Sequence, residues 1–314
     1  MENKFVSLVI YLHNDAEHIE KFLDAVVVPV TEKFSQLEMI FVDDGCQEYT
    51  VKKLRECIEQ KGVSGMVSIL HMGFHQGIEA AMNAGRDASI GDFVYEFDSM
   101  IVDYDSELIY EVYEKLLTGY DIVSATNNID RSLASKSFYG IFNRYSNSRA
   151  KIGTETFRLI SRRAINRVKS LGTYIPYRKA VYANCGLGKT DVVYESKLEY
   201  KNRKEAMKLQ AMGKERRTLA LDSFIYFTNV MEKISAIVSA VFLVFSLFMI
   251  IYSLADYYLE RTLAEGWASL MCFMSLGFFG VFMLLTIILK YLSVLLDLEF
   301  KKQKYLVSDI EKIK

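Results

Sequence analysis

Proline is nearly absent from this sequence, with two in 314 residues, and tryptophan occurs only once. So little proline argues against a flexible linker between parts of the chain. The four cysteines form neither a CxxC pair nor a disulfide-framework spacing, which is typical of unpaired thiols in a reducing compartment. The formal net charge of −1 argues against a general nucleic-acid binder.

Motifs of several common site types are missing as well. No GxGxxG fingerprint follows the first expected strand, which argues against a dinucleotide-binding dehydrogenase. The four histidines lack a spacing such as HExxH, which disfavours a zinc site. Residues Gly186–Thr190 resemble the end of a P-loop, but its first glycine would fall at Ala183, and the β-prone Asp191–Tyr194 replaces the required helix.

Charged residues are missing from two long runs, Ile234–Ala255 and Gly266–Leu289. The chain is 51% hydrophobic with a mean hydropathy of +0.11, which is high for a purely soluble protein. Each run exceeds the roughly 20 residues that cross a bilayer as a helix. We therefore expect a hairpin of two transmembrane helices, over 234–255 and 267–289; two buried core helices are the alternative.

Basic residues flank this hairpin on both outer sides, whereas the short connector holds three acids and one arginine. By the positive-inside rule, both termini and the soluble domain are expected in the cytoplasm, at the plasma (inner) membrane. No basic stretch followed by an apolar one begins the chain, so no cleaved signal is expected. The expected parts are a domain over 1–196, an amphipathic juxtamembrane segment or plain linker helix over 197–232, the hairpin over 233–290, and a cytoplasmic tail over 291–314.

The first part of the chain alternates short β-rich runs with helical ones, which predicts an α/β domain with a parallel sheet covered by helices. Strands are expected over 5–12, 38–42, 67–70, 92–97 and 121–125, and helices over 16–28, 49–60, 77–88 and 106–117. From residue 135 the pattern becomes more helical.

Acidic residues stand at the ends of two expected strands, which is the edge where ligands bind in open α/β sheets. Asp43 and Asp44 end one strand, where a plain Asp-Asp-Gly turn is the alternative interpretation. Asp98 ends the other, and Asp103 and Asp105 follow it. Carboxylates are ligands for Mg²⁺ or Mn²⁺, which bridge diphosphates. Together these acids predict a nucleotide-diphosphate site.

The order of these motifs resembles inverting glycosyltransferases of the GT-A fold, and more narrowly the polyprenyl-phosphate glycosyltransferases related to dolichyl-phosphate mannose synthase. The resemblance covers essentially the whole chain. It is carried by the following residues: 7–15 with Glu17, 40–45, Gly77, 79–81, Gly85, 87–88, 91–92, Lys136, 138–139, 143–144, 157–159, 161–163, Tyr291, Glu299, Lys301 and 305–307.

The resemblance implies that a sugar passes from UDP or GDP to a polyprenyl phosphate such as undecaprenyl phosphate, with inversion, in a homo-oligomer such as a tetramer. The implied residues are catalytic Asp98, Asp103 and Arg158; nucleotide-binding Tyr11, His13, Asp15, Asp43, Asp44 and Asp98; phosphate-binding Arg131, Lys136, Arg158, Arg162 and Arg163; and Asp98 as ligand of Mg²⁺ or Mn²⁺.

The sequence departs from that family where its metal motif carries a second acid, because Met100 stands there. A thioether is a poor ligand for a hard cation. Asp103 or Asp105 are candidates to replace the lost ligand, and Glu155 to replace the acid that Thr156 displaces. The alternative to an active enzyme is a non-catalytic relative that serves as a partner or scaffold of another membrane glycosyltransferase. A processive synthase is a third interpretation, disfavoured because no Gln-x-x-Arg-Trp block is present.

Overall fold

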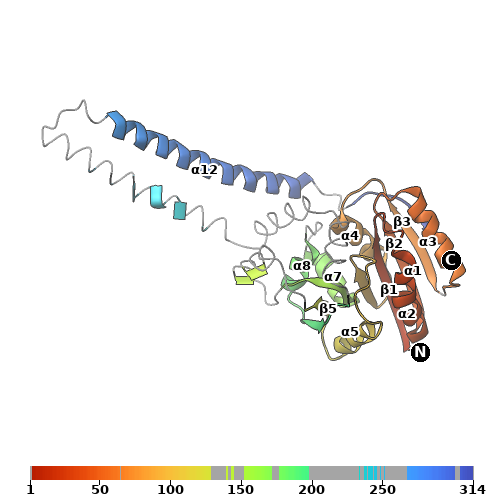
Figure 1. Cartoon of the computed structure of the whole chain (residues 1–314). Helices are drawn as coiled ribbons and strands as arrows, with labels where there is room; N and C mark the ends of the chain where they lie inside the picture. Colours follow the sequence, from red (N-terminus) through yellow and green to blue (C-terminus); the bar gives the residue numbers. More distant parts are fainter. Residues whose placement is uncertain are drawn as a thin grey trace. The chain divides into compact units, whose positions relative to one another are not determined.

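The computed structural model describes residues 2–63, 65–128, 152–171, 177–197, 267–300 and 305–313, with isolated positions between 139 and 144 and between 233 and 251. The chain forms two compact units (Figure 1). The first unit joins Met1–Ala220 to Lys301–Lys314, and the second is Leu221–Phe300. The C-terminal end of the chain therefore belongs to the same unit as the N-terminal domain.

Strands and helices alternate along the first unit, and every strand and helix expected up to residue 125 is present. They are β1 (Glu2–Leu12), α1 (Ile19–Phe22), the π-helical η1 (Leu23–Val27), α2 (Val28–Lys33), β2 (Phe34–Asp43), α3 (Glu48–Gln60), β3 (Met66–Met72), α4 (Ile78–Ala88), β4 (Phe93–Phe97), α5 (Glu107–Leu117) and β5 (Ile122–Asn127). The first helical stretch runs on through Pro29 to Lys33, with the π-helical turn η1 directly before this proline.

The later elements of this unit are β6 (Glu155–Ser161), α7 (Arg162–Leu171), α8 (Arg178–Asn184), β7 (Lys189–Tyr194) and β8 (Val307–Lys312). The eight strands form one sheet in the order β7-β5-β6-β4-β1-β2-β3-β8. β6 runs antiparallel between β4 and β5, and β8 runs antiparallel to β3. The five strands expected from the sequence, β1 to β5, all run in one direction, as predicted. The sheet is nevertheless mixed, because β6 and β8, which were not expected, run antiparallel to them.

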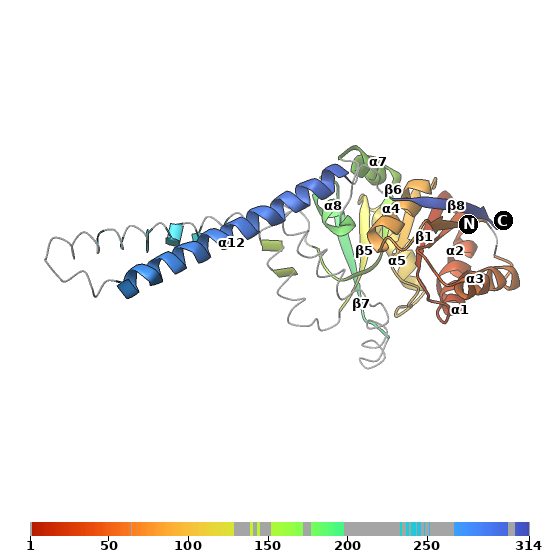
Figure 2. The same ribbon diagram turned by 90° about the horizontal axis from the view of Figure 1, so that it is seen from above.

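Helices cover both faces of the sheet (Figure 2). On one face α1, η1, α3 and α5 pack over alternate β1 residues, including Val6, Leu8 and Ile10. On the other face α4, α7 and α8 pack over a second cluster that contains Val9. Because β1 is apolar on both faces, it reads as a continuous hydrophobic run, as strands buried on both sides do.

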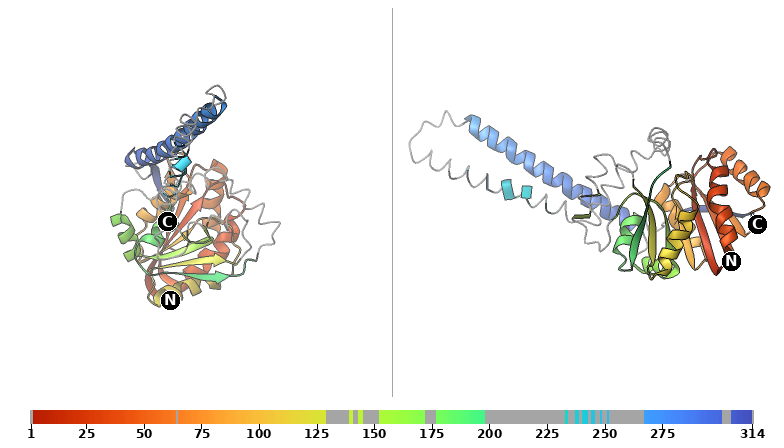
Figure 3. Two further views of the ribbon diagram at one scale, coloured as in Figure 1. Left: turned by 90° about the vertical axis from the view of Figure 1, so that its left-hand side faces the viewer. Right: turned by 60° about the horizontal axis from the view of Figure 1, so that its bottom comes forward.

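The C-terminal strand β8 extends the sheet beyond β3, beside the N-terminal elements (Figure 3, right panel). Its residues pair with Ser68 to Met72 of β3. The expected cytoplasmic tail thus contains a strand of the main sheet. The sequence did not predict this strand, because it is short and most of its side chains are exposed, so it carries no buried apolar pattern.

The second unit contains α12 (Trp267–Phe300). In the part of the chain that the structure describes, no helix has both the length and the apolar character to cross a membrane. The transmembrane hairpin stays a prediction. Residues 198–232 of the expected juxtamembrane segment and most of the first expected span lie outside the described residues.

Candidate functional site

Three parallel strands end side by side at one edge of the sheet. β1 ends at Leu12, β2 at Asp43 and β4 at Phe97, and β1 pairs with both of the others. The polar residues that follow, from His13, Asp44 and Asp98 onward, consequently lie along the same edge, as the sequence predicted.

Asp44 organises the loops at this edge from within. It is fully buried, and its carboxylate accepts hydrogen bonds from the backbone N–H groups of Gln76 (2.7 Å) and Gly77 (2.9 Å). The hydroxyl of buried Tyr11 donates to the same carboxylate at 3.0 Å. These bonds hold the start of α4 against the end of β2, so Asp44 and Tyr11 shape the site rather than face it.

Asp43 lies at the same strand end and is held from two sides. Its Oδ1 accepts a hydrogen bond from the Cys46 N–H at 2.8 Å, and its Oδ2 lies 2.7 Å from Nδ1 of His71. Nε2 of His71 lies 3.3 Å from Glu311 of β8, and Glu311 accepts two hydrogen bonds from Arg55, at 2.9 and 2.7 Å. His71 thus links Glu311 of the C-terminal strand to Asp43, and Arg55 of α3 holds Glu311 from its other side.

Two imidazoles line the edge beside Asp43. The rings of His13 and His75 lie 4.4 Å apart, and the Nδ1 atoms of both approach the backbone oxygen of Asp44, at 2.8 and 3.2 Å. Asp15 lies two residues after His13. Burial raises the pKa of its carboxyl above the ordinary value, although the hydrogen bond from the His13 backbone N–H opposes this shift. Flat rings beside carboxylates offer stacking and hydrogen bonding to a nucleoside.

Asp98 is held by two arginines. Arg158 of β6 donates to its Oδ2 at 2.6 Å, and Arg178 of α8 donates to its Oδ1 at 2.8 Å. Burial by itself would raise the pKa of Asp98, but these two guanidinium groups outweigh it and hold the pKa well below the usual range. Asp98 is therefore ionised and doubly paired.

Both arginines are fully buried in a wider network of charges. Glu96 accepts from Arg158 at 2.8 Å, from Arg178 at 2.7 Å and from the Tyr182 hydroxyl at 2.7 Å. Glu155 accepts from Arg158 at 3.1 Å and from Lys189 at 2.9 Å.

One more acid, Glu79, completes this network. Glu79 accepts from Arg178 Nε at 2.9 Å. Burial opposes the ionisation of Glu155, yet Lys189 and Arg158 lower its pKa to about 2. The cluster of Glu79, Glu96, Asp98, Glu155, Arg158, Arg178, Tyr182 and Lys189 is named the buried charge network below.

A divalent metal ion does not fit the donors arranged at Asp98. Both of its carboxylate oxygens are taken by guanidinium groups, and Met100 is buried in the apolar core. Asp103 accepts from the Tyr194 and Ser196 hydroxyls at 2.6 and 2.7 Å. Within the described ranges, no group of three or more His, Cys, Asp or Glu side chains is placed to hold a metal.

Two of the predicted phosphate-binding residues, Arg162 and Arg163, do not join this edge. Arg162 donates to the Gly91 carbonyl oxygen and Arg163 to Asp121. Because β6 is antiparallel to β4, the start of α7 lies beside the beginning of β4, at the opposite edge from Asp98. The two arginines are therefore not part of this site. Arg131 and Lys136 lie outside the described residues, and Asp105 pairs with Lys197.

Sequence reasoning missed Glu96 and Arg178. Glu96 stands inside the otherwise apolar strand Phe93–Phe97, and a charged residue in a buried strand signals a buried partner. Arg178 follows no recognisable motif, and its nearest carboxylate partners are 80 to 99 residues away in sequence. Only the fold brings them together.

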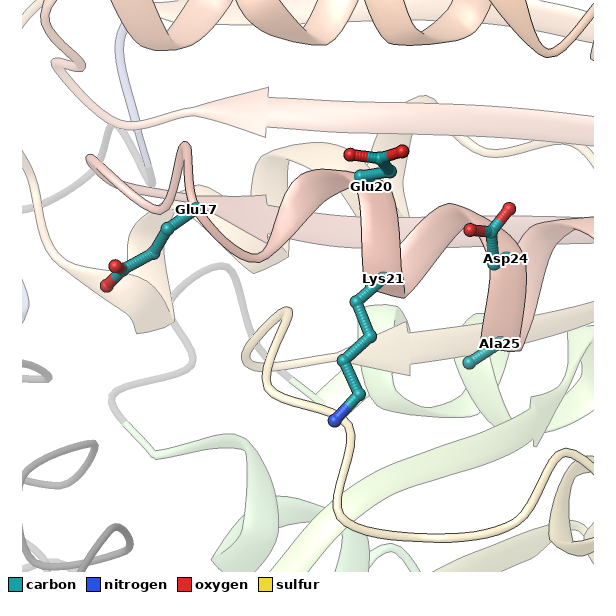
Figure 4. Close-up of a pocket in the computed structure, with 5 residues that line it drawn as sticks. All are labelled: Glu17, Glu20, Lys21, Asp24 and Ala25. Atoms are coloured by element: carbon teal, nitrogen blue, oxygen red, sulfur yellow. The ribbon is translucent and has the colours of Figure 1, made fainter.

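A surface hollow of about 460 Å³ lies elsewhere, on α1 and η1 (Figure 4). Glu17, Glu20, Lys21, Asp24 and Ala25 line it, and their side chains point apart rather than into a common cavity. Three of the five are acids, which repel a phosphate. The hollow is therefore not the candidate site.

The sequence is similar to those of known glycosyltransferases. Residues 7–169 match the family described as Glycosyl transferase family 2. An uncharacterised glycosyltransferase of Synechocystis is 26% identical, over 97% of this chain and 95% of that protein. A prophage bactoprenol glucosyl transferase homologue of Escherichia coli and the bactoprenol glucosyl transferase of Shigella phage SfX are each 30% identical over 60% of this chain, and the match spans 62% of their length. Among solved structures, a mannosyltransferase of Pyrobaculum calidifontis in complex with GDP-mannose and Mn²⁺ is similar with a TM-score of 0.47 and 15% identity, over 93% of this chain and 88% of that chain.

Proposed function

This chain belongs to the family 2 glycosyltransferases, and we propose that it transfers a sugar from a nucleotide sugar to a polyprenyl phosphate such as undecaprenyl phosphate, with inversion. The mixed α/β sheet is that of a GT-A glycosyltransferase. The names of the relatives from Escherichia coli and phage SfX, which couple glucosyl transfer to bactoprenol, support a lipid carrier as acceptor. The alternative of a non-catalytic scaffold has no such support.

The observation that carries this proposal is the pair of strand ends at Asp43 and Asp98, with the imidazoles of His13 and His75 beside them. Asp43 is oriented by Cys46 and His71, and we assign it to the nucleoside together with His13 and Asp15. A fixed carboxylate loses little conformational entropy when it accepts hydrogen bonds from a ribose or a base.

The reaction itself needs little basic assistance. A phosphate monoester has its second pKa near 6, so the acceptor is largely dianionic at neutral pH. One of its oxygens attacks the anomeric carbon and forms the new C–O bond, while the bond to the nucleoside diphosphate breaks and its electron pair leaves with the diphosphate. The demanding step is the departure of this anion, which needs cationic stabilisation.

Of the cations that were expected to meet phosphates, Arg158 is committed to the buried charge network and Arg162 and Arg163 lie at the other edge. Arg131 and Lys136 stay predictions for this role. The divalent ion expected at Asp98 does not fit the donor set, and no step is assigned to it.

In this proposal the two apolar runs hold the catalytic unit at the cytoplasmic face of the plasma membrane, where a lipid phosphate emerges from the headgroup layer. The basic residues around residue 215 would favour anionic headgroups. A homo-oligomer is part of the same proposal.

The test is a panel of UDP- and GDP-sugars offered to the purified chain with a short-chain polyprenyl phosphate, with mass spectrometry of the lipid product. We expect one donor to yield glycosyl phospholipid. In Asp43→Asn the KM for that donor should rise about tenfold or more, the loss expected when one charged hydrogen bond to a ligand is removed.

The matched control is Glu114→Gln, which makes the same change from acid to amide on the exposed face of α5 and should leave KM unchanged. Absence of product with every donor, together with absence of UDP and GDP binding, would refute the proposal.

A further inference from the structure

Resting on the proposed function, we infer that this glycosyltransferase binds its nucleotide diphosphate without a divalent cation at Asp98, because two buried arginines occupy the carboxylate that would hold it. Asp98 is then an anchor for Arg158 and Arg178 rather than a metal ligand.

The first argument is the residue two positions after Asp98. Met100 is 1% exposed and belongs to the apolar core on the α1 and α5 face of the sheet. Its thioether is a poor ligand for Mg²⁺ or Mn²⁺, and it packs among apolar side chains rather than facing solvent. Asp98 would have to hold a metal without the second acid of an acid-x-acid pair.

The second argument is that both oxygens of Asp98 are already engaged. Arg158 and Arg178 each place a nitrogen within 2.8 Å of a different oxygen. Charge-assisted bonds to guanidinium groups are among the strongest that a carboxylate makes. A divalent ion at Asp98 would also lie beside two full positive charges, which repel it.

The third argument is that the arginines cannot withdraw to admit an ion. Both side chains are 0% exposed, and both also bind Glu96, whose own side chain is 0% exposed. Moving either guanidinium out would leave a buried glutamate with fewer partners, at a high desolvation penalty. The pairing at Asp98 is therefore built into the core between β4, β6 and α8.

The fourth argument concerns the acids that could have replaced the missing ligand. Both oxygens of Asp103 accept hydrogen bonds, from Tyr194 and from Ser196, and Asp103 is 6% exposed. Asp105 pairs with Lys197 on the surface. Among the described residues, no group of three or more His, Cys, Asp or Glu side chains that could hold a metal contains either acid.

Two measurements on the purified full chain test this inference. Mn²⁺ is titrated into the wild-type protein and into Asp98→Asn, and free Mn²⁺ is followed by electron paramagnetic resonance. UDP and GDP are then titrated calorimetrically with EDTA or with Mg²⁺. We expect no Mn²⁺ site that depends on Asp98, and nucleotide dissociation constants that agree within about twofold between the two buffers, a difference below 1 kcal/mol.

A single Mn²⁺ site that disappears in Asp98→Asn, or nucleotide binding that Mg²⁺ tightens about tenfold or more, would overturn the inference. Should Asp98→Asn fail to fold, the wild-type titrations decide, because a metal-independent site shows neither a stoichiometric Mn²⁺ ion nor a metal effect on nucleotide affinity. Failure of the proposed function looks different: no nucleotide binds in either buffer, while the Mn²⁺ titration still reports on Asp98.

Discussion

Arg178→Met removes one of the two guanidinium groups at the centre of the buried charge network, and we expect it to destabilise the first unit severely. Arg178 donates from three nitrogens to three acids, Glu79 at 2.9 Å, Glu96 at 2.7 Å and Asp98 at 2.8 Å. Glu96 and Asp98 keep Arg158 in the variant, but Glu79 loses the guanidinium. Removal of one partner from a buried ion pair costs about 3–5 kcal/mol, a large part of the 5–15 kcal/mol that stabilises an ordinary domain.

Thiol labelling measures this loss within the first unit alone. Cys57 and Cys185 are both buried there, at 7% and 2% exposure, so a thiol reagent reaches them only when the unit opens. Labelling rates across a urea series, read by peptide mass spectrometry, yield the free energy of opening. We expect the labelling of both cysteines to accelerate in Arg178→Met by a factor that corresponds to the loss of about 3–5 kcal/mol.

Arg163→Met is the matched control, because it removes an arginine whose side chain is 72% exposed and leaves its partner Asp121 with the hydrogen bond from the Ser161 hydroxyl. Its labelling rates should stay close to the wild-type values. Equal rates in Arg178→Met and Arg163→Met would refute the view that the buried charge network stabilises the fold.

Three further expectations concern other parts of the first unit. The pKa of Glu155 is lowered to about 2, so its ionisation stabilises the fold at a pH above its unfolded pKa near 4.5, and this contribution is lost as the pH falls from 4.5 towards 2. The melting temperature should therefore drop across that pH window, and it should drop less in Glu155→Gln. Gly85→Ala should cost about 1–3 kcal/mol, because its new Cβ would lie 2.4 Å from a methyl group of Val9, whereas Gly277→Ala, with no neighbour within 4 Å, should leave the urea midpoint of the first unit unchanged. Glu311→Gln removes the ion pair of Arg55 with β8 and should lower the free energy of unfolding by at most about 1 kcal/mol, because both side chains are about a third exposed. Hydrogen exchange of the β8 amides should accelerate, and unchanged exchange would show that Glu311 does not hold the strand.

Several features followed from the sequence because they depend on local pattern. The alternation of apolar runs predicted β1 to β5 and the intervening helices with small errors at the ends. Strand-end acids at Asp43, Asp44 and Asp98 were placed correctly at one edge, because parallel strands bring their carboxyl ends together. The rejection of a P-loop at 186–190 agrees with β7, which begins at Lys189.

Other features could not be predicted because they depend on contacts between distant parts of the chain. Arg158 was expected to neutralise a phosphate, but β6 turns it into the core against Glu96 and Asp98. The β8 strand is short and mostly exposed, and only its pairing with β3 and the Glu311 contacts locate it.

The sequence by itself determined the class of fold, the edge at which the site lies and the two apolar runs, since hydrophobic periodicity and chain direction are local properties. Only the tertiary structure decided what the acids at that edge do. A carboxylate acts as a metal ligand, a loop anchor or an ion-pair partner according to which groups surround it, and for Asp44 and Asp98 those groups come from loops, strands and helices up to 80 residues away in sequence.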